Sequence, residues 1–140
     1  MAFVADASIA LAWYFPDENS ATANRVRERL LDDRVCVPVH WPLEVVNALF
    51  AALRRQRINE RELRELIEDF RRLPDWVDQH TGASAWSKTA DLALEHGLTS
   101  YDAAYLELAL RLDLPLATLD KALAKAAVAA GGRLLSECAA

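Results

Sequence analysis

Four acidic residues are the parts of this sequence best placed to do chemistry. Each lies at the end of a predicted strand or in the first turn of a predicted helix. They are Asp6, Glu44, Asp102 and Asp120. Carboxylates that gather in one place repel one another and their pKa values rise, so such a cluster needs a cation. Because oxygen ligands suit Mg²⁺ or Mn²⁺ better than Zn²⁺, the set predicts a site for one of the first two ions.

A small polar residue stands two or three positions from each acid. Such a side chain can orient a carboxylate, a metal-bound water or a phosphate oxygen. Each residue also has an ordinary alternative, because serine caps helices and asparagine satisfies backbone groups. Four acid–polar pairs in equivalent positions are harder to explain as caps. The four polar residues are Ser8, Asn47, Ser100 and Thr118.

The stretch TSYDAAYLELAL, residues 99–110, shows the choice between structure and chemistry most clearly. Thr99 can cap a helix, and Asp102 three residues later can complete a capping box. A negative charge in the first turn also suits the helix dipole. Taken alone the stretch favours this structural role, and only the other acids argue for a ligand.

Short apolar runs alternate with helical patterns, and this alternation must position the acids. It predicts an α/β fold with a parallel sheet of about four to five strands flanked by helices, in one domain over residues 1–140. In such folds ligand sites form at the edge where the carboxyl ends of the strands lie. The predicted strands are 3–6, 35–39, 76–79 and 115–120, with a possible last one at 133–135. The predicted helices are 20–33, 42–56, 59–73, 84–96, 100–113 and 121–130.

Single residues sharpen some of these boundaries. Pro38 confines the second strand to a sheet edge or marks its end. Pro42 suits the first turn of the next helix. Asn59 is the expected cap of the helix after that. Gly97 occupies the usual position of a left-handed residue that ends a helix.

The composition is that of an ordinary globular domain, with 53% hydrophobic and 26% charged residues. No apolar run is long enough to span a membrane, and the start lacks the pattern of a signal peptide. The two cysteines, Cys36 and Cys138, are too few for a disulfide framework. We therefore expect a cytoplasmic protein without a membrane segment.

The ordered motifs resemble the PIN-domain family, and more narrowly the VapC-type toxin ribonucleases of toxin–antitoxin pairs. They are VADAS, PLEVVNAL, SYDAAYLELA and LATLD, and the resemblance covers almost the whole chain. Asp6, Glu44, Asp102 and Asp120 match the family's acidic quartet. Ser8 and Thr118 match its supporting polar positions, and Asn47 matches the usual asparagine of the second motif.

The resemblance implies an Mg²⁺- or Mn²⁺-dependent endoribonuclease that cleaves RNA phosphodiesters with an activated water. Two acids would hold the metal, and Asp102 or Asp120 would orient or deprotonate the water. Family members are usually homodimers held silent by a cognate antitoxin. We expect the antitoxin to insert a cation into the acidic pocket, since an Arg fork pairs well with carboxylates.

The net charge of −5 argues mildly against a general nucleic-acid binder. Arg54, Arg55 and Arg57 form a local basic patch that can bind RNA phosphates. An equal alternative is a solvated helix end that places cations near its C-terminus. His40 lies just before the Glu44 helix and is within reach of the predicted site.

Apolar excess also predicts a homodimer. The helix at 100–113 is apolar on several faces, and the one at 43–53 has a wide apolar stripe. Obligate dimer interfaces resemble a core cut in half.

Two other functions stay open. One is a catalytically silent module that keeps the fold and binds a partner protein or RNA. The other is a receiver-like phosphoacceptor domain, which also gathers acids at strand ends. That second alternative needs a lysine at the end of a late strand, where the chain has only Lys121, after the acid.

Overall fold

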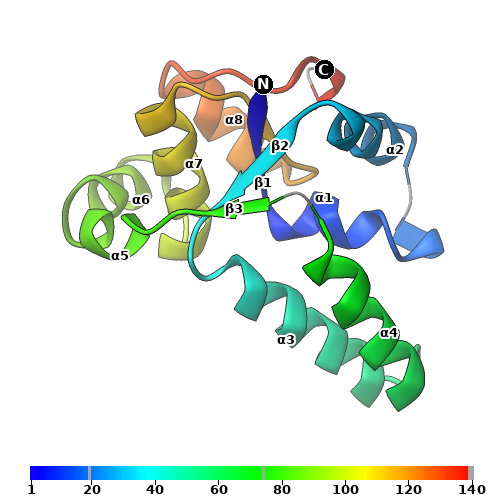
Figure 1. The fold of residues 1–140 in the computed structure, drawn as a ribbon. Helices are drawn as coiled ribbons and strands as arrows, with labels where there is room; N and C mark the ends of the chain where they lie inside the picture. The colour runs from blue at the N-terminus through cyan, green and yellow to red at the C-terminus, as the bar shows by residue number, and fades with distance from the viewer. Residues whose placement is uncertain (19, 74, 139–140) are drawn as a thin grey trace.

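A four-stranded parallel sheet runs through the middle of the molecule and is surrounded by helices (Figure 1). The computed structural model describes residues 1–18, 20–73 and 75–138. The strands lie in the order β3-β2-β1-β4, and each neighbouring pair is parallel. They are β1 (Ala2–Ala5), β2 (Arg34–Val37), β3 (Asp75–Val77) and β4 (Leu116–Ala117). The predicted fold class is confirmed.

The helices alternate with the strands, which is what a parallel sheet requires of its crossovers. The α-helices are α1 (Ala7–Ala12), α2 (Ala21–Glu28), α3 (Trp41–Arg54), α4 (Glu60–Arg71), α5 (Thr81–Ser84), α6 (Ala90–His96), α7 (Ser100–Leu112) and α8 (Lys121–Ala129). A π-helical turn, Ala85–Thr89, joins α5 to α6. Short 3₁₀ turns occupy Pro16–Glu18, Arg29–Leu31 and Ser136–Cys138.

Several predicted elements differ in extent from the observed ones. β2 is an interior strand, and Pro38 directly follows its last residue, so the proline marks an end and not an edge. β4 has two residues and not six. The possible last strand is reduced to one bridge between Leu116 and Leu134. The short helix α1 directly follows Asp6; the sequence pattern assigns it no range and indicates it only through the alternative in which Ser8 caps a helix after the first strand.

The local end signals act as expected. The Asn59 side chain accepts a hydrogen bond from the Glu62 amide, and the Glu62 side chain accepts one from the Asn59 amide. The helix α4 therefore begins with a full capping box. Gly97 ends α6 with a φ of 65°, a conformation that suits a residue without a side chain.

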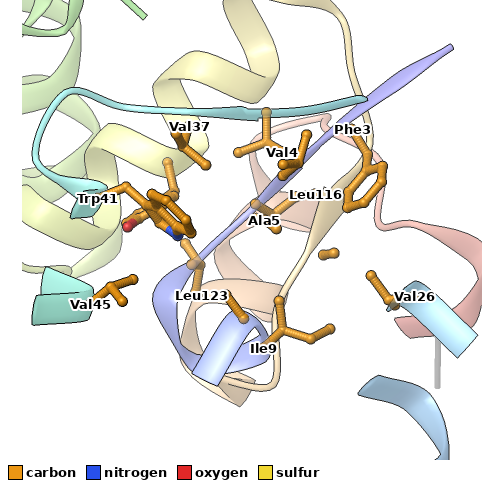
Figure 2. Close-up of a cluster of buried hydrophobic side chains, with 14 of the residues drawn as sticks. Phe3, Val4, Ala5, Ile9, Val26, Val37, Trp41, Val45, Leu116 and Leu123 are labelled. Atoms are coloured by element: carbon orange, nitrogen blue, oxygen red, sulfur yellow. The ribbon is translucent and has the colours of Figure 1, made fainter. Parts of the chain in front are cut away.

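β1 lies at the centre of the hydrophobic core. Figure 2 shows Phe3, Val4 and Ala5 of this strand among buried side chains from β2, β4 and the helices α1, α2, α3 and α8. α7 is buried along most of its length, from Ala103 to Ala109. The apolar excess of this helix is therefore used inside the monomer, and it no longer argues for a dimer.

In the described part of the chain, no helix has both the length and the apolar character needed to cross a membrane.

Candidate active site

Asp6 follows β1 directly, and its side chain is only 4% exposed. The Ser8 hydroxyl donates to its Oδ1 at 2.6 Å, and the Ile9 amide donates to the same oxygen at 3.2 Å. The Thr118 hydroxyl donates to Oδ2. Asp6 is thus the N-cap of α1, and the alternative in which Ser8 caps that helix is wrong.

The two supporting hydroxyls also tie β4 to β1. Ser8 Oγ accepts from the Leu119 amide at 3.3 Å, and Thr118 Oγ1 accepts from the Asp120 amide at 3.0 Å. Asp120 in turn caps α8, because its Oδ1 accepts from the Leu123 amide at 3.1 Å. Adjacent parallel strands end at the same edge of the sheet, so these contacts place Asp6 and Asp120 within one hydrogen-bonded framework.

Glu44 lies in the first turn of α3. Its Oε1 accepts a hydrogen bond from the Tyr105 hydroxyl at 2.7 Å and lies 3.2 Å from His40 Nε2. Burial by itself raises the pKa of Glu44. The hydrogen bonds from His40 and Tyr105 outweigh burial, so the pKa of this carboxyl lies below its ordinary value.

Asp102 lies in the first turn of α7, where Thr99 is the N-cap and accepts from the Asp102 amide at 3.1 Å. The helix-capping role is therefore present. The side chain also belongs to the acidic group, because burial first, and then the charges of Asp120 and Glu44, raise the pKa of Asp102. Thr99 caps the helix, but the return bond from its amide to the Asp102 side chain, which a capping box needs, is not seen in the described residues. The role of Asp102 as a ligand stays a prediction.

Asp6 is electrostatically part of the same group. Burial is the largest influence and raises its pKa to about 6, against the hydrogen bonds from Ser8, Thr118 and the Ile9 amide. The charge of Asp102 raises it further. The charge of Asp102 thus acts on Asp6, and the charges of Asp120 and Glu44 act on Asp102. We call these four residues the acidic cluster.

The acidic cluster fits an ion such as Mg²⁺ that is bound partly through water molecules. Within residues 1–18, 20–73 and 75–138, no three His, Cys, Asp or Glu side chains stand close enough to hold one ion directly. Mg²⁺ is usually held by one or two carboxylates and keeps several waters. An all-oxygen donor set in which some acids act through water therefore fits such an ion.

The donors around the acidic cluster are almost all neutral. Asp6 and Glu44 accept from serine, threonine and tyrosine hydroxyls, and Asp120 accepts from a backbone amide. Among the described residues, His40 is the only donor to these acids that can carry a positive charge, and no Lys or Arg forms an ion pair with them. The cluster is left with a net negative charge, which is the property a cation site needs.

Asn47 and Ser100 are not drawn into this hydrogen-bond network. Both side chains are exposed, and no hydrogen bond to either is seen in the described part of the chain. Asn47 lines a surface hollow of about 420 Å³ beside Glu44, together with His40, Leu43 and Tyr101. The capping alternative for Ser100 is wrong, because Thr99 is the N-cap of α7.

The basic patch lies at the opposite end of α3 from Glu44. Ten residues of helix separate Arg54 from Glu44, which is about 15 Å along the axis. Arg57 pairs with Asp17 at 2.6 Å, and its guanidinium lies 4.8 Å from the centre of the Phe15 ring. Arg54 and Arg55 are exposed. The structure therefore does not bring this patch to the acidic cluster, and Arg57 is already engaged within the fold.

Tyr105 is the contact residue that the sequence analysis missed. It lies three residues after Asp102, so both side chains project from neighbouring positions on one face of α7. That spacing was the available signal, but an aromatic residue in an apolar helix is ordinarily a core residue. Its ring is indeed buried, at 1% exposure, while its hydroxyl reaches Glu44.

Comparison with known proteins identifies the family. A family model described as "PIN domain" matches residues 3–129. The chain belongs to the PIN-domain family. Among curated proteins, this PIN domain is 34% identical over 125 residues to "Ribonuclease VapC3" of Pyrobaculum aerophilum, covering 89% of this chain and 94% of that protein. The predicted resemblance is confirmed.

Solved structures agree with the fold of this PIN domain. PAE2754 from Pyrobaculum aerophilum is 25% identical and superposes with a TM-score of 0.57, covering 90% of this chain and 87% of its own. FitAcB from Neisseria gonorrhoeae superposes with a TM-score of 0.66 over 98% of both chains. Its identity is 17%, so that likeness concerns the fold alone.

Proposed function

We propose that this PIN domain is a metal-dependent endoribonuclease and the toxin of a type II toxin–antitoxin pair. The observation that supports the proposal is the acidic cluster, whose carboxylates influence one another's pKa values and receive mainly neutral donors. The similarity to Ribonuclease VapC3 supports RNA as the substrate.

The acidic cluster would hold Mg²⁺ or Mn²⁺, with one or two acids in direct contact and the others acting through water. When bound, the ion supplies a water of lowered pKa and polarises the scissile phosphate. Asp6 is kept in place by Ser8 and Thr118, so it is the best-fixed ligand of the set. Asp102 or Asp120 orients or deprotonates the attacking water, and Glu44 completes the site.

Substrate binding would use residues outside the acidic cluster. Arg54 and Arg55 are exposed cations suited to phosphates further along the RNA. Asn47 and Ser100 lie exposed near Glu44 and Asp102, where they can contact the phosphate backbone or a metal-bound water.

The partner would be a cognate antitoxin that inserts a guanidinium into the acidic cluster. Among the described residues the cluster has no arginine of its own, and an Arg fork can bind a carboxylate with two bonds. We expect the antitoxin to stop inhibiting RNA cleavage when the arginines and lysines at its toxin-binding end are replaced. Unchanged inhibition would contradict this partner mode.

We further propose that the protein is a cytoplasmic homodimer. The dimer argument now rests on exposed apolar side chains of α3, since Leu43 is 73% exposed and Phe50 is 42% exposed. Two large apolar side chains on one helix are typical of an interface core. Light scattering at micromolar concentration should report a dimer, and a monomer there would contradict the proposal.

The function is tested by incubating the purified chain with a panel of structured and single-stranded RNAs. Cleavage should require Mn²⁺ or Mg²⁺, stop with EDTA and be lost in Asp6→Asn. A chain that folds and binds RNA or an antitoxin, yet cleaves nothing with either ion, would instead be the silent PIN module.

A further inference from the structure

We propose that Tyr105 is a positioning residue that fixes the Glu44 carboxylate within the acidic cluster. The inference rests on the proposed function, because it assigns a role inside that site. Its basis is the hydrogen bond from the Tyr105 hydroxyl to Glu44 Oε1, which is 2.7 Å long and joins α7 to α3.

The ring of Tyr105 gives this hydroxyl a fixed place. Tyr105 is 1% exposed and lies on the buried helix α7, so its ring is held by the core. Its ring centre is 5.3 Å from that of His40, in an edge-to-face arrangement. A long flexible acid such as Glu44 therefore receives its anchor from a side chain that cannot easily move.

α7 thereby supplies two groups to the site. Asp102 contributes a carboxylate from the first turn, and Tyr105 contributes the hydroxyl that holds the carboxylate of α3. Because Asp102 and Tyr105 lie on neighbouring turns of one rigid helix, the position of Glu44 is set relative to Asp102. The hydrogen bond from Tyr105 to Glu44 also joins α7 to α3 at the site.

The chemistry of the donor matters as much as its position. A phenol donates a hydrogen bond without adding positive charge, whereas an Arg or Lys there would neutralise Glu44 and compete with a cation. Both donors that reach Glu44, Tyr105 and His40, contact Oε1. Among the described residues no donor contacts Oε2, so that oxygen stays available to a metal or its water.

His40 cannot replace Tyr105 in this role. Its Nε2 lies 3.2 Å from Glu44 Oε1 and also 3.2 Å from the Tyr101 carbonyl oxygen. A single ring nitrogen that faces two acceptors is shared between them, and its hydrogen depends on the tautomer. The tyrosine hydroxyl has one acceptor and is the more definite anchor.

The test is Tyr105→Phe, which removes one oxygen and keeps the ring. We would measure Mn²⁺ binding by calorimetry in the absence of RNA. Loss of an outer-shell partner of a metal ligand costs about 10- to 100-fold in metal affinity. We expect a weakening of at least about tenfold in Tyr105→Phe. The melting temperature without metal should stay close to that of the wild type.

Tyr14→Phe is the matched control. Tyr14 also packs its ring on an aromatic partner, Phe70, with centres 4.5 Å apart, and its hydroxyl makes no hydrogen bond in the described part of the chain. This change should leave both Mn²⁺ binding and cleavage unaltered. A Tyr105→Phe protein that melts lower but binds Mn²⁺ like the wild type would overturn the proposal.

A double-mutant cycle tests whether Tyr105 acts through Glu44. In a Glu44→Gln background, Tyr105→Phe should weaken Mn²⁺ binding no further, because the carboxylate that it positions is gone. Independent, additive losses would contradict the proposed path. A wrong assignment of the ribonuclease function would give a different result from a wrong role of Tyr105. The wild type itself would then show no metal-dependent cleavage.

A second measurement covers the case in which Tyr105→Phe does not fold. In the wild type the Tyr105 hydroxyl proton should exchange slowly enough with solvent to be seen by NMR. In Glu44→Ala the acceptor is missing and the signal should be lost. A signal that is absent in the wild type, or unchanged in Glu44→Ala, would overturn the proposal.

Discussion

This protein has two groups of buried acids that differ in their partners. One group is paired with an arginine, and the other receives hydrogen bonds mainly from neutral donors. Asp78, after β3, is fully buried and pairs with the guanidinium of Arg111 at 2.6 Å. Arg111 also binds Glu107, which is 4% exposed, at 2.7 Å. Asp6 is equally buried at 4% exposure, but it receives only hydroxyl and backbone donors.

The pKa values follow this difference. Burial raises the pKa of both aspartates. At Asp78 the hydrogen bonds from Arg111 and Thr81 outweigh burial, and the pKa falls below its ordinary value. At Asp6 burial prevails, and the pKa rises to about 6. Asp78 is paired with a cation inside the fold, whereas Asp6, which we propose as a metal ligand, is left without one.

α7 carries both arrangements. Asp102 lies in its first turn, and Glu107 and Arg111 lie one turn apart in its second half. The helix therefore offers a direct comparison, in which changes at one end should affect chemistry and changes at the other should affect stability.

The largest effect is expected for Asp102→Asn. Cleavage should fall by a factor on the order of 100 or more, because aligning and activating the metal-bound water supplies much of the rate enhancement. Stability without metal should hold or rise, because the charges of Asp120 and Glu44 raise the pKa of Asp102 and asparagine relieves this repulsion. The Mn²⁺-induced thermal shift should shrink.

The matched control for this change is Glu60→Gln, since Glu60 is an exposed first-turn acid of α4, a helix that begins at a true N-cap. It should cost only about 0.3–1 kcal/mol through the helix dipole and leave cleavage unaltered. An Asp102→Asn protein that behaves in this way would show that Asp102 is merely a first-turn charge.

At the other end of α7, Arg111→Met should lower the free energy of unfolding by about 3 kcal/mol. Removing one partner of a buried ion pair leaves the other charges uncompensated, here those of Asp78 and Glu107. Mn²⁺ binding should be unchanged, which denaturant unfolding and calorimetry would check together. Arg133→Met is the control, since its partner Asp113 is 94% exposed and the pair should contribute at most about 1 kcal/mol.

The acidic cluster could be predicted from the sequence, whereas the buried ion pairs of Arg111 could not. Parallel strands end on one edge of a sheet, so Asp6 and Asp120 could be placed from topology alone. The pair of Asp78 and Arg111 joins residues 33 positions apart, and nothing local marks either of them. Long-range partners depend on how helices pack, which periodicity does not specify.

The length of β4 was also predicted incorrectly, because contacts distant in the sequence decide where this strand ends. The apolar run at 115–120 reads as a strand, yet β4 ends at Ala117. The amides of Leu119 and Asp120 instead bond to the hydroxyls of Ser8 and Thr118. The site's own hydrogen bonds therefore shorten the strand, and a sequence pattern cannot show that competition.

The pH dependence of stability should separate the two aspartates. Because the folded-state pKa of Asp6 is raised to about 6, its contribution to metal-free stability is present below about pH 4 and is lost as the pH rises through 6. The wild type should lose about 2 kcal/mol relative to Asp6→Asn across this range. For Asp78 the pKa is lowered, so its contribution is present at neutral pH and is lost as the pH falls.

Denaturant unfolding of the wild type, Asp6→Asn and Asp78→Asn between about pH 3 and 7 would check this, because Asp78 loses its contribution only below its ordinary pKa of 3.8. The two stability differences from the wild type should change with pH in opposite directions. If both curves ran parallel to that of the wild type, the two environments would not differ as described.

The smallest effect is expected for Ser8→Ala, which removes one neutral donor from Asp6. The bond from Ser8 to Oδ1 lowers the pKa of Asp6, so its loss should raise that pKa further. Below about pH 4 Asp6 is protonated in both proteins, and the variant should be only slightly less stable than the wild type, because the helix preference of alanine partly offsets the lost bond from the Leu119 amide. Above pH 6 the variant should be less stable by about 1 kcal/mol, since a bond to the charged carboxylate is then missing. Ser84→Ala, in α5, is the control and should show no such growth with pH. A constant difference between Ser8→Ala and the wild type at all pH values would mean that Ser8 holds the Leu119 amide and does not stabilise the charge of Asp6.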